Sequence, residues 1–69
     1  MTDSVYKVIE LIGTSSESWE KAAANAIARA AESLRELRIA EVLEMDLQLD
    51  EGEVVAYRTK VKVSFKSED

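Results

Sequence analysis

The chain has 69 residues, a formal net charge of −5, and neither cysteine nor histidine. These absences exclude disulfides and thiolate metal sites, and they remove the commonest general base. Nucleic-acid affinity rests on clustered Lys and Arg, so the acidic balance disfavours a phosphate-binding surface but suits hard cations such as calcium or magnesium. A chain this short makes one domain, residues 1–69. It buries only about 60% of its unfolded surface, which leaves oligomerisation as its source of extra stability.

The sequence favours a cytoplasmic protein without membrane or nucleic-acid partners. No apolar run approaches the roughly 18 residues that a membrane span requires. The start, Met1-Thr2-Asp3-Ser4, lacks the basic and apolar regions of a signal peptide.

Residues 4–12 are rich in β-branched and aromatic types and predict a first strand, which we expect Gly13 to end. Residues 14–16 then form a strand-to-helix turn. We predict Ser15 as the helix N-cap, because two glutamates follow it where they meet the positive helix end. A phosphate cradle is the minority alternative, since a single loop glycine is weak evidence for one.

Residues 16–37 predict a helix, because apolar side chains recur at three- and four-residue spacing. The stripe consists of Trp19, Ala22, Ala23, Ala26, Ile27, Ala30, Leu34 and Leu37. Alanines at positions 24, 28 and 31 either let another backbone approach closely or reflect helix propensity alone, and both explanations stay open. We interpret Trp19 as core or interface filler packed on strand residues rather than as a platform for ligand stacking.

Residues 38–50 and 54–66 predict two long strands, joined by the three residues Glu51-Gly52-Glu53 with positive φ at Gly52. Apolar side chains occupy odd positions and should share one face: Ile39, Leu43, Met45, Leu47 and Leu49, then Val55, Tyr57, Val61, Val63 and Phe65. On the other face the register should pair an acidic strand with a basic one, which fixes alignment more than it stabilises. The expected pairs are Asp50 with Val54, Asp46 with Arg58, and Glu44 with Lys60.

The element order predicts an α+β fold, β-α-β-β, in which a three-stranded antiparallel sheet wraps over one helix. One helix cannot cover both faces of such a sheet, and the two edge strands stay open. We therefore expect an obligate assembly with other copies of the chain.

No catalytic constellation is present, so an enzyme is not expected. The acidic residues Glu41, Glu44, Asp46 and Asp50 lie on one strand among Lys and Arg partners, and we interpret them as solvated or salt-bridged. The alternative is binding of a hard cation, with one carboxylate from each of several subunits meeting at a symmetry axis.

Several segments together resemble the dodecin family: residues 4–15, Ser18-Trp-Glu-Lys-Ala-Ala, Ser33-Leu-Arg, Ala40-Glu-Val and Val61-Lys-Val-Ser-Phe. The resemblance spans essentially the whole chain. It implies a hollow homododecamer of cubic symmetry. It also implies, for typical members, flavin binding in stacked pairs, with a tryptophan at the start of the second strand and a glutamine in the third.

This chain departs from that flavin pattern. Ile39 stands where the tryptophan would be, Arg58 where the glutamine would be, and Asp46 where several flavin binders carry an arginine. Losing aromatic stacking forfeits roughly 1–3 kcal/mol per ring, and Trp19 at the helix start does not replace it.

The resemblance is nearest to the tryptophan-lacking branch called calcium dodecin, which implies a binding or storage shell with weak or lost flavin binding and calcium or another cation as ligand. No catalytic residue or metal ligand is assigned. Flavin sequestration and a purely structural scaffold remain the alternatives.

Overall fold

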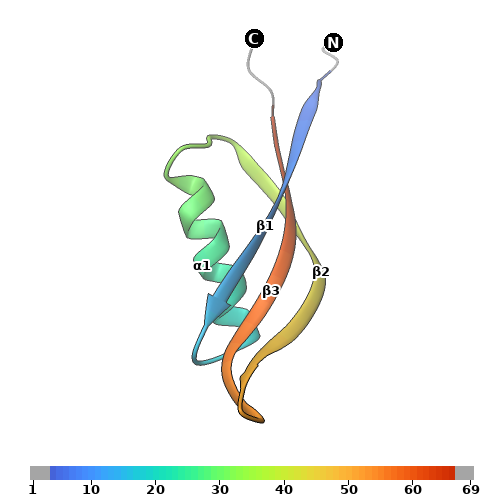
Figure 1. Ribbon diagram of the computed structural model, residues 1–69. Helices are drawn as coiled ribbons and strands as arrows, with labels where there is room; N and C mark the ends of the chain where they lie inside the picture. The colour runs from blue at the N-terminus through green and yellow to red at the C-terminus, as the bar shows by residue number, and fades with distance from the viewer. Residues whose placement is uncertain (1–3, 67–69) are drawn as a thin grey trace.

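The structure, a computed structural model, describes residues 4–66 and contains one helix and three strands. The elements are β1 (Tyr6–Ser15), α1 (Trp19–Ala31), β2 (Leu37–Asp50) and β3 (Glu53–Lys66). The strands form one antiparallel sheet in the order β1-β3-β2, with α1 along one side (Figure 1). The predicted β-α-β-β architecture is confirmed. Residues 1–3, which entered the argument against a signal peptide, lie outside the described part.

The core lies between α1 and the central strand β3. Thr59, Val61 and Val63 alternate along β3 and are each 1% exposed, because their side chains all point at the helix. The predicted apolar face of this strand is confirmed for Val61 and Val63, whereas Val55 near the hairpin turn is 47% exposed. The apolar side chains that pack around the core are Ile9, Leu11, Ala23, Ile27 and Leu37.

The helix sits very close to β1. Its buried side chains are alanines, Ala22, Ala26 and Ala30, which hold the backbones near each other. A Cβ added to Gly13 would lie 2.0 Å from the carbonyl oxygen of Ala22. The prediction that Gly13 ends the first strand is therefore wrong: Gly13 lies inside β1 because the helix backbone leaves no room for a side chain there.

The helix begins and ends at other residues than expected. Ser18 is the N-cap, and its hydroxyl accepts a hydrogen bond from the Lys21 amide at 3.0 Å. Ser15, predicted as the cap, instead accepts from the Glu17 amide at 2.9 Å and so closes the turn before the helix. The helix stops at Ala31 rather than at residue 37, and Glu36 takes a positive φ of 61° before β2 begins.

The β2–β3 hairpin turns in two residues rather than the predicted three. Glu51 and Gly52 both have positive φ, 51° and 81°, which is the pattern of a type I′ turn. Asp50 consequently pairs with Glu53 and not with Val54. An irregularity at Gln48/Leu49 then shifts the register, so the predicted pairs of Asp46 with Arg58 and of Glu44 with Lys60 are confirmed.

Two further register shifts in β2 change which face its side chains occupy. Val42 pairs with Val61 and so lies on the helix side, whereas Ile39 pairs with Ser64 on the opposite side. The expectation that the odd positions of this strand share one face is wrong for Ile39. A bulge adds one residue to one strand, and one residue is enough to exchange the two faces.

The helix lies over β1 and β3 and contacts β2 least, while β2 bows away from it (Figure 1). Much of the apolar surface of the protomer is exposed as a result. The exposed large apolar side chains on β2 are Ile39, Val42, Met45, Leu47 and Leu49. Within residues 4–66, no helix is both long enough and apolar enough to cross a membrane.

Candidate ligand-binding site

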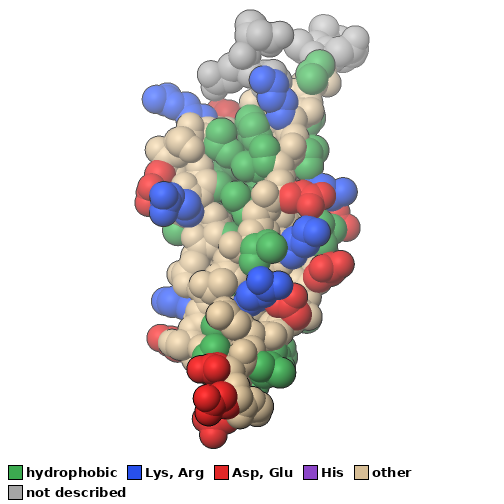
Figure 2. Space-filling view, viewed as in Figure 1, with side chains coloured by type: hydrophobic (Ala, Val, Ile, Leu, Met, Phe, Trp, Pro, Cys, Tyr) green, Lys and Arg blue, Asp and Glu red, His purple; other side chains and the backbone are tan. Residues whose placement is uncertain are grey.

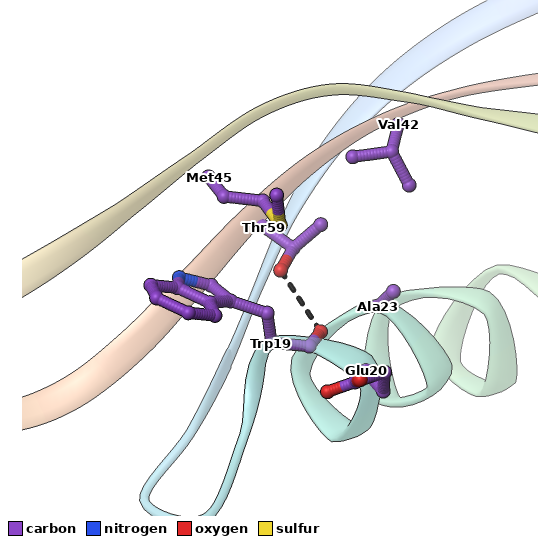
Figure 3. Close-up of a pocket in the computed structure, with 6 residues that line it drawn as sticks. All are labelled: Trp19, Glu20, Ala23, Val42, Met45 and Thr59. Carbon is purple, nitrogen blue, oxygen red and sulfur yellow. Dashed lines mark hydrogen bonds between the residues drawn. The ribbon is translucent and has the colours of Figure 1, made fainter.

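An open groove lies where β2 departs from the start of α1 (Figure 3). Its volume is about 450 Å³, and its lining residues are Trp19, Glu20, Ala23, Val42, Met45 and Thr59. Four of the six are apolar, so the groove offers contact area and few polar groups.

Trp19 forms a fixed wall of this groove. Its indole Nε1 donates to the backbone oxygen of Asp46 at 3.0 Å, and its ring meets Tyr57 edge to face with centroids 5.2 Å apart. The Thr59 hydroxyl donates to the Trp19 backbone oxygen at 2.9 Å (Figure 3). The prediction that Trp19 packs on strand residues is confirmed.

Charged side chains of β2 and β3 lie on the sheet face that the helix does not cover, which we call the helix-free face. Exposed apolar side chains of β1, Val8 and Ile12, lie on this face as well. Figure 2 shows acidic and basic side chains side by side over part of the visible surface. Arg58 holds Asp46 through two hydrogen bonds, from Nε at 2.7 Å and from Nη2 at 2.9 Å. Two looser pairs follow it along β3: Lys60 lies 3.7 Å from Glu10, and Lys62 lies 4.0 Å from Glu41.

The Asp46–Arg58 pair alters the titration of both groups. Hydrogen bonds from the guanidinium lower the pKa of Asp46 below its usual value, and the carboxylate correspondingly raises the pKa of Arg58. Both side chains therefore remain charged over the whole neutral range, and the two-point geometry fixes their orientation.

Ile39 lies on the same helix-free face but far from this pair. The residue is 67% exposed. Because it lies at the edge of the sheet, it also borders a smaller hollow of about 140 Å³ on the helix side, beside Ile27 and Leu37. Its partner Ser64 is six residues from Arg58 along β3, a distance of about 20 Å at roughly 3.3 Å per residue. One protomer thus does not bring Ile39 and Arg58 together.

The carboxylates of β2 are spread out rather than clustered. Asp46 and Glu41 are in ion pairs, Glu44 lies opposite Lys60 in the register, and Asp50 is exposed beside the turn. Among residues 4–66, no three acidic side chains are close enough together to hold a metal ion. The salt-bridged interpretation is confirmed for Asp46 and Glu41, while any metal site built from Asp and Glu side chains of this part of the chain would need more than one protomer.

Sequence reasoning missed two features of these surfaces. The groove beside Val42 and Met45 depends on a bulge for which the sequence carries no glycine or proline signal. The contact of Glu10 with Lys60 is diagonal, because the register of β1 against β3 places Glu10 opposite Lys62 and Lys60 opposite Ile12; the basic residues on one face of β3 were the available signal.

Together these features define a small α+β binding protein. Its edge strand β2 exposes apolar side chains, and its helix-free face carries charged ones. The chain belongs to the dodecin family, whose model matches residues 5–68.

Two named relatives align over nearly the whole chain. The calcium dodecin of Mycobacterium tuberculosis is 52% identical over 63 residues, covering 91% of this chain and 89% of that protein. The dodecin of Thermus thermophilus is 42% identical over 65 residues, covering 94% of each.

Solved structures agree in fold. Streptomyces coelicolor dodecin matches with a TM-score of 0.93 at 33% identity, covering 100% of this chain and 99% of that one. Mycobacterium tuberculosis calcium dodecin matches with a TM-score of 0.86 at 51% identity, covering 94% and 93%, and is described as calcium chelating with a novel calcium-binding site. Binding of small ligands, calcium among them, is therefore supported at the level of the family.

Proposed function

We propose that twelve copies of this chain form a non-enzymatic cytoplasmic shell that binds or stores a small ligand, with calcium or another hard cation bound and flavin binding weak or lost. The observation that carries this proposal is the two-point ion pair between Asp46 and Arg58. Arg58 stands where typical members would present a glutamine to the flavin, and in this pair its guanidinium is already bound to the Asp46 carboxylate.

Assembly follows from the exposed apolar surface of β2. Val42, Met45 and Leu49 are 51%, 57% and 60% exposed in the protomer, and they lie on a long edge strand. Edge strands of this kind associate with other chains unless they are protected. Closed symmetric assembly would bury this surface, and a dodecamer would have a mass of roughly 92 kDa (12 × 7.7 kDa).

Weak flavin binding follows from the two separated positions. Because Ile39 and Arg58 lie about 20 Å apart in one protomer, a site that used both would take them from different copies. Each copy would then supply an isoleucine in place of a stacking ring and an arginine already engaged by Asp46. Both changes remove interactions that an isoalloxazine ring would require.

Cation binding is supported by the charge balance and by the calcium-chelating relative. The chain carries 14 acidic against 9 basic residues, and several carboxylates lie on exposed strands and at the hairpin turn. Oxygen ligands of this kind suit calcium, with 6–8 oxygens in a typical site. Since one protomer gathers no such set within residues 4–66, the site would form where copies meet.

One titration series tests the proposal. Light scattering should give a particle near 92 kDa, and calorimetry should show a clear calcium signal together with little or no heat from riboflavin or FMN. Calcium at a concentration well above its Kd should also raise the melting temperature, and EDTA should reverse the rise. A particle that binds riboflavin tightly would instead support the alternative of flavin sequestration, and one that binds neither ligand would support a scaffold.

The variant Ile39→Trp tests the flavin argument separately. A restored ring should tighten riboflavin binding by about tenfold to a hundredfold, which corresponds to roughly 1–3 kcal/mol of stacking. Ile39→Phe offers a smaller ring and should give an intermediate gain. No gain from either variant would show that the missing ring is not what limits binding.

A further inference from the structure

Arg58 is the best-placed anion receptor on the helix-free face. It lies on the central strand, and its side chain is 41% exposed, so a ligand in solvent could reach it. A guanidinium presents its N–H groups as a planar fork that matches phosphate and carboxylate oxygens. Here one edge of that fork, Nε and Nη2, is occupied by the two oxygens of Asp46.

The surroundings of Arg58 would favour an anion if Asp46 were absent. Lys60 lies two residues further along the same strand and on the same face, roughly 7 Å away. Its Nζ is 3.7 Å from Glu10, which is longer than a hydrogen bond. Thr14 is the register partner of Arg58 on β1 and is exposed. Lys60 is thus a second cation near the position that the Asp46 carboxylate now holds, while Thr14 borders Arg58 on the opposite, β1 side and Glu44 faces Lys60 from β2.

We propose that Asp46 sets the ligand selectivity of the helix-free face: its carboxylate acts as a built-in competitor that closes Arg58 to phosphate and carboxylate ligands. An internal group of this kind competes at an effective concentration of at least about millimolar, so a free oxyanion at lower concentration does not displace it. A ligand that binds beside Arg58 is therefore expected to be neutral or cationic. This inference deepens the proposed function, from which it takes only the assumption that ligands reach this face.

The experiment measures binding of inorganic phosphate to the assembled Asp46→Ala protein by calorimetry at low ionic strength. We expect Asp46→Ala to bind phosphate at least tenfold more tightly than the unaltered protein. In the same variant, the affinity for FMN should increase more than the affinity for riboflavin, because FMN carries a phosphate that riboflavin lacks. Low salt is needed because exposed charges are screened.

Glu44→Ala is the matched control. It removes one carboxylate from the same strand and makes the same change in net charge, but among residues 4–66 Glu44 forms no ion pair within 4.0 Å. Arg58 stays engaged in this variant, so phosphate binding should stay at the unaltered level. The double variant Asp46→Ala/Arg58→Ala should lose the gain.

Three results would overturn the proposal. The first is equal phosphate binding by Asp46→Ala and Glu44→Ala, and the second is a gain that persists without Arg58. The third is loss of the assembled particle in both Asp46→Ala and the near-isosteric Asp46→Asn, which would assign the pair a structural role instead. Each result leaves the particle mass and the calcium titration of the unaltered protein untouched, so failure here is distinguishable from failure of the proposed function.

Discussion

The two long strands of the hairpin have similar apolar content, yet they lie in different surroundings. Val61 on β3 is 1% exposed, while its partner Val42 on β2 is 51% exposed. The difference comes from α1, whose alanine face packs tightly on β1 and β3 and does not reach the middle of β2. The central strand β3 thus belongs to the core of the protomer, and β2 carries apolar surface suited to other protomers. The other edge strand, β1, packs on the helix with one face and exposes Val8 and Ile12 on the other.

The substitution Met45→Glu is expected to have the largest effect. It places a carboxylate in the middle of the exposed β2 surface, and burying it between copies without a partner would be strongly unfavourable. We expect light scattering to show loss of the large particle. Ser16→Glu, in the exposed turn before α1, makes the same change in net charge; it is the control and should leave the particle intact. A Met45→Glu protein of unchanged mass would show that this surface stays in water.

Gly13→Ala tests the covered side of the comparison. The added methyl group would lie 2.0 Å from the Ala22 oxygen and 3.0 Å from the Ala26 side chain, so α1 must move off the sheet. We expect a loss of about 3 kcal/mol or more in urea unfolding, at the upper end of overpacking effects. Gly52→Ala is the control: nothing lies within 4 Å, and its positive φ of 81° should cost about 1–2 kcal/mol. A smaller loss for Gly13→Ala than for Gly52→Ala would contradict the close approach.

Val61→Ala and Val42→Ala compare the two strands directly. Removing two methyl groups from the core should cost about 2–3 kcal/mol at Val61, including the cavity term. If assembly buries Val42, its truncation should cost a similar amount in the particle, and the cost should fall as the protein is diluted. Melting temperatures at several protein concentrations check this. A small, concentration-independent effect at Val42 would place this side chain outside any interface.

The smallest expected effect concerns pH. Arg58 depresses the pKa of Asp46 in the folded protein below the unfolded value of 3.8. A depressed folded pKa contributes stability above the unfolded pKa, and this stability is lost as the pH falls through the folded value. The urea midpoint of the unaltered protein should therefore approach that of Asp46→Asn below about pH 4. A difference between the two proteins that stays constant from pH 6 to pH 2.5 would argue against the ion pair.

The fold could be predicted from the sequence where one residue pattern had one structural meaning. The alternation on β3 and the four-residue spacing of the buried alanines on α1 were of this kind, and so was the opposition of Asp46 and Arg58. The boundaries were harder. Residues 14, 15, 16 and 18 all carry hydroxyl groups that can cap a helix. N-cap propensity alone could therefore not choose Ser18 over Ser15. Glu36 has a positive φ at the end of the loop before β2, and because it is not a glycine the sequence gives no sign of that conformation.

The site was less predictable than the fold, because it depends on bulges and on close backbone contacts. The bulge between Val42 and Glu44 exchanges the faces of β2, so that Ile39 and Met45 lie on opposite faces, and no residue type marks its place. Gly13 was interpreted as a strand end because a glycine permits turns, whereas here it permits contact with the helix. Both errors arose because tertiary packing decides these features, and the local residue pattern does not predict tertiary packing.

The hydrogen bond from the Trp19 indole to the Asp46 backbone provides a natural optical sensor. Trp19 is the sole tryptophan, so the intrinsic emission above tyrosine background comes from one ring, positioned where the helix meets the departing strand. Any event that pulls β2 from α1, or that fills the space beside it, should shift the wavelength or intensity of this emission. Assembly and ligand entry can therefore be followed in real time without a label, and the two can be separated by their dependence on dilution.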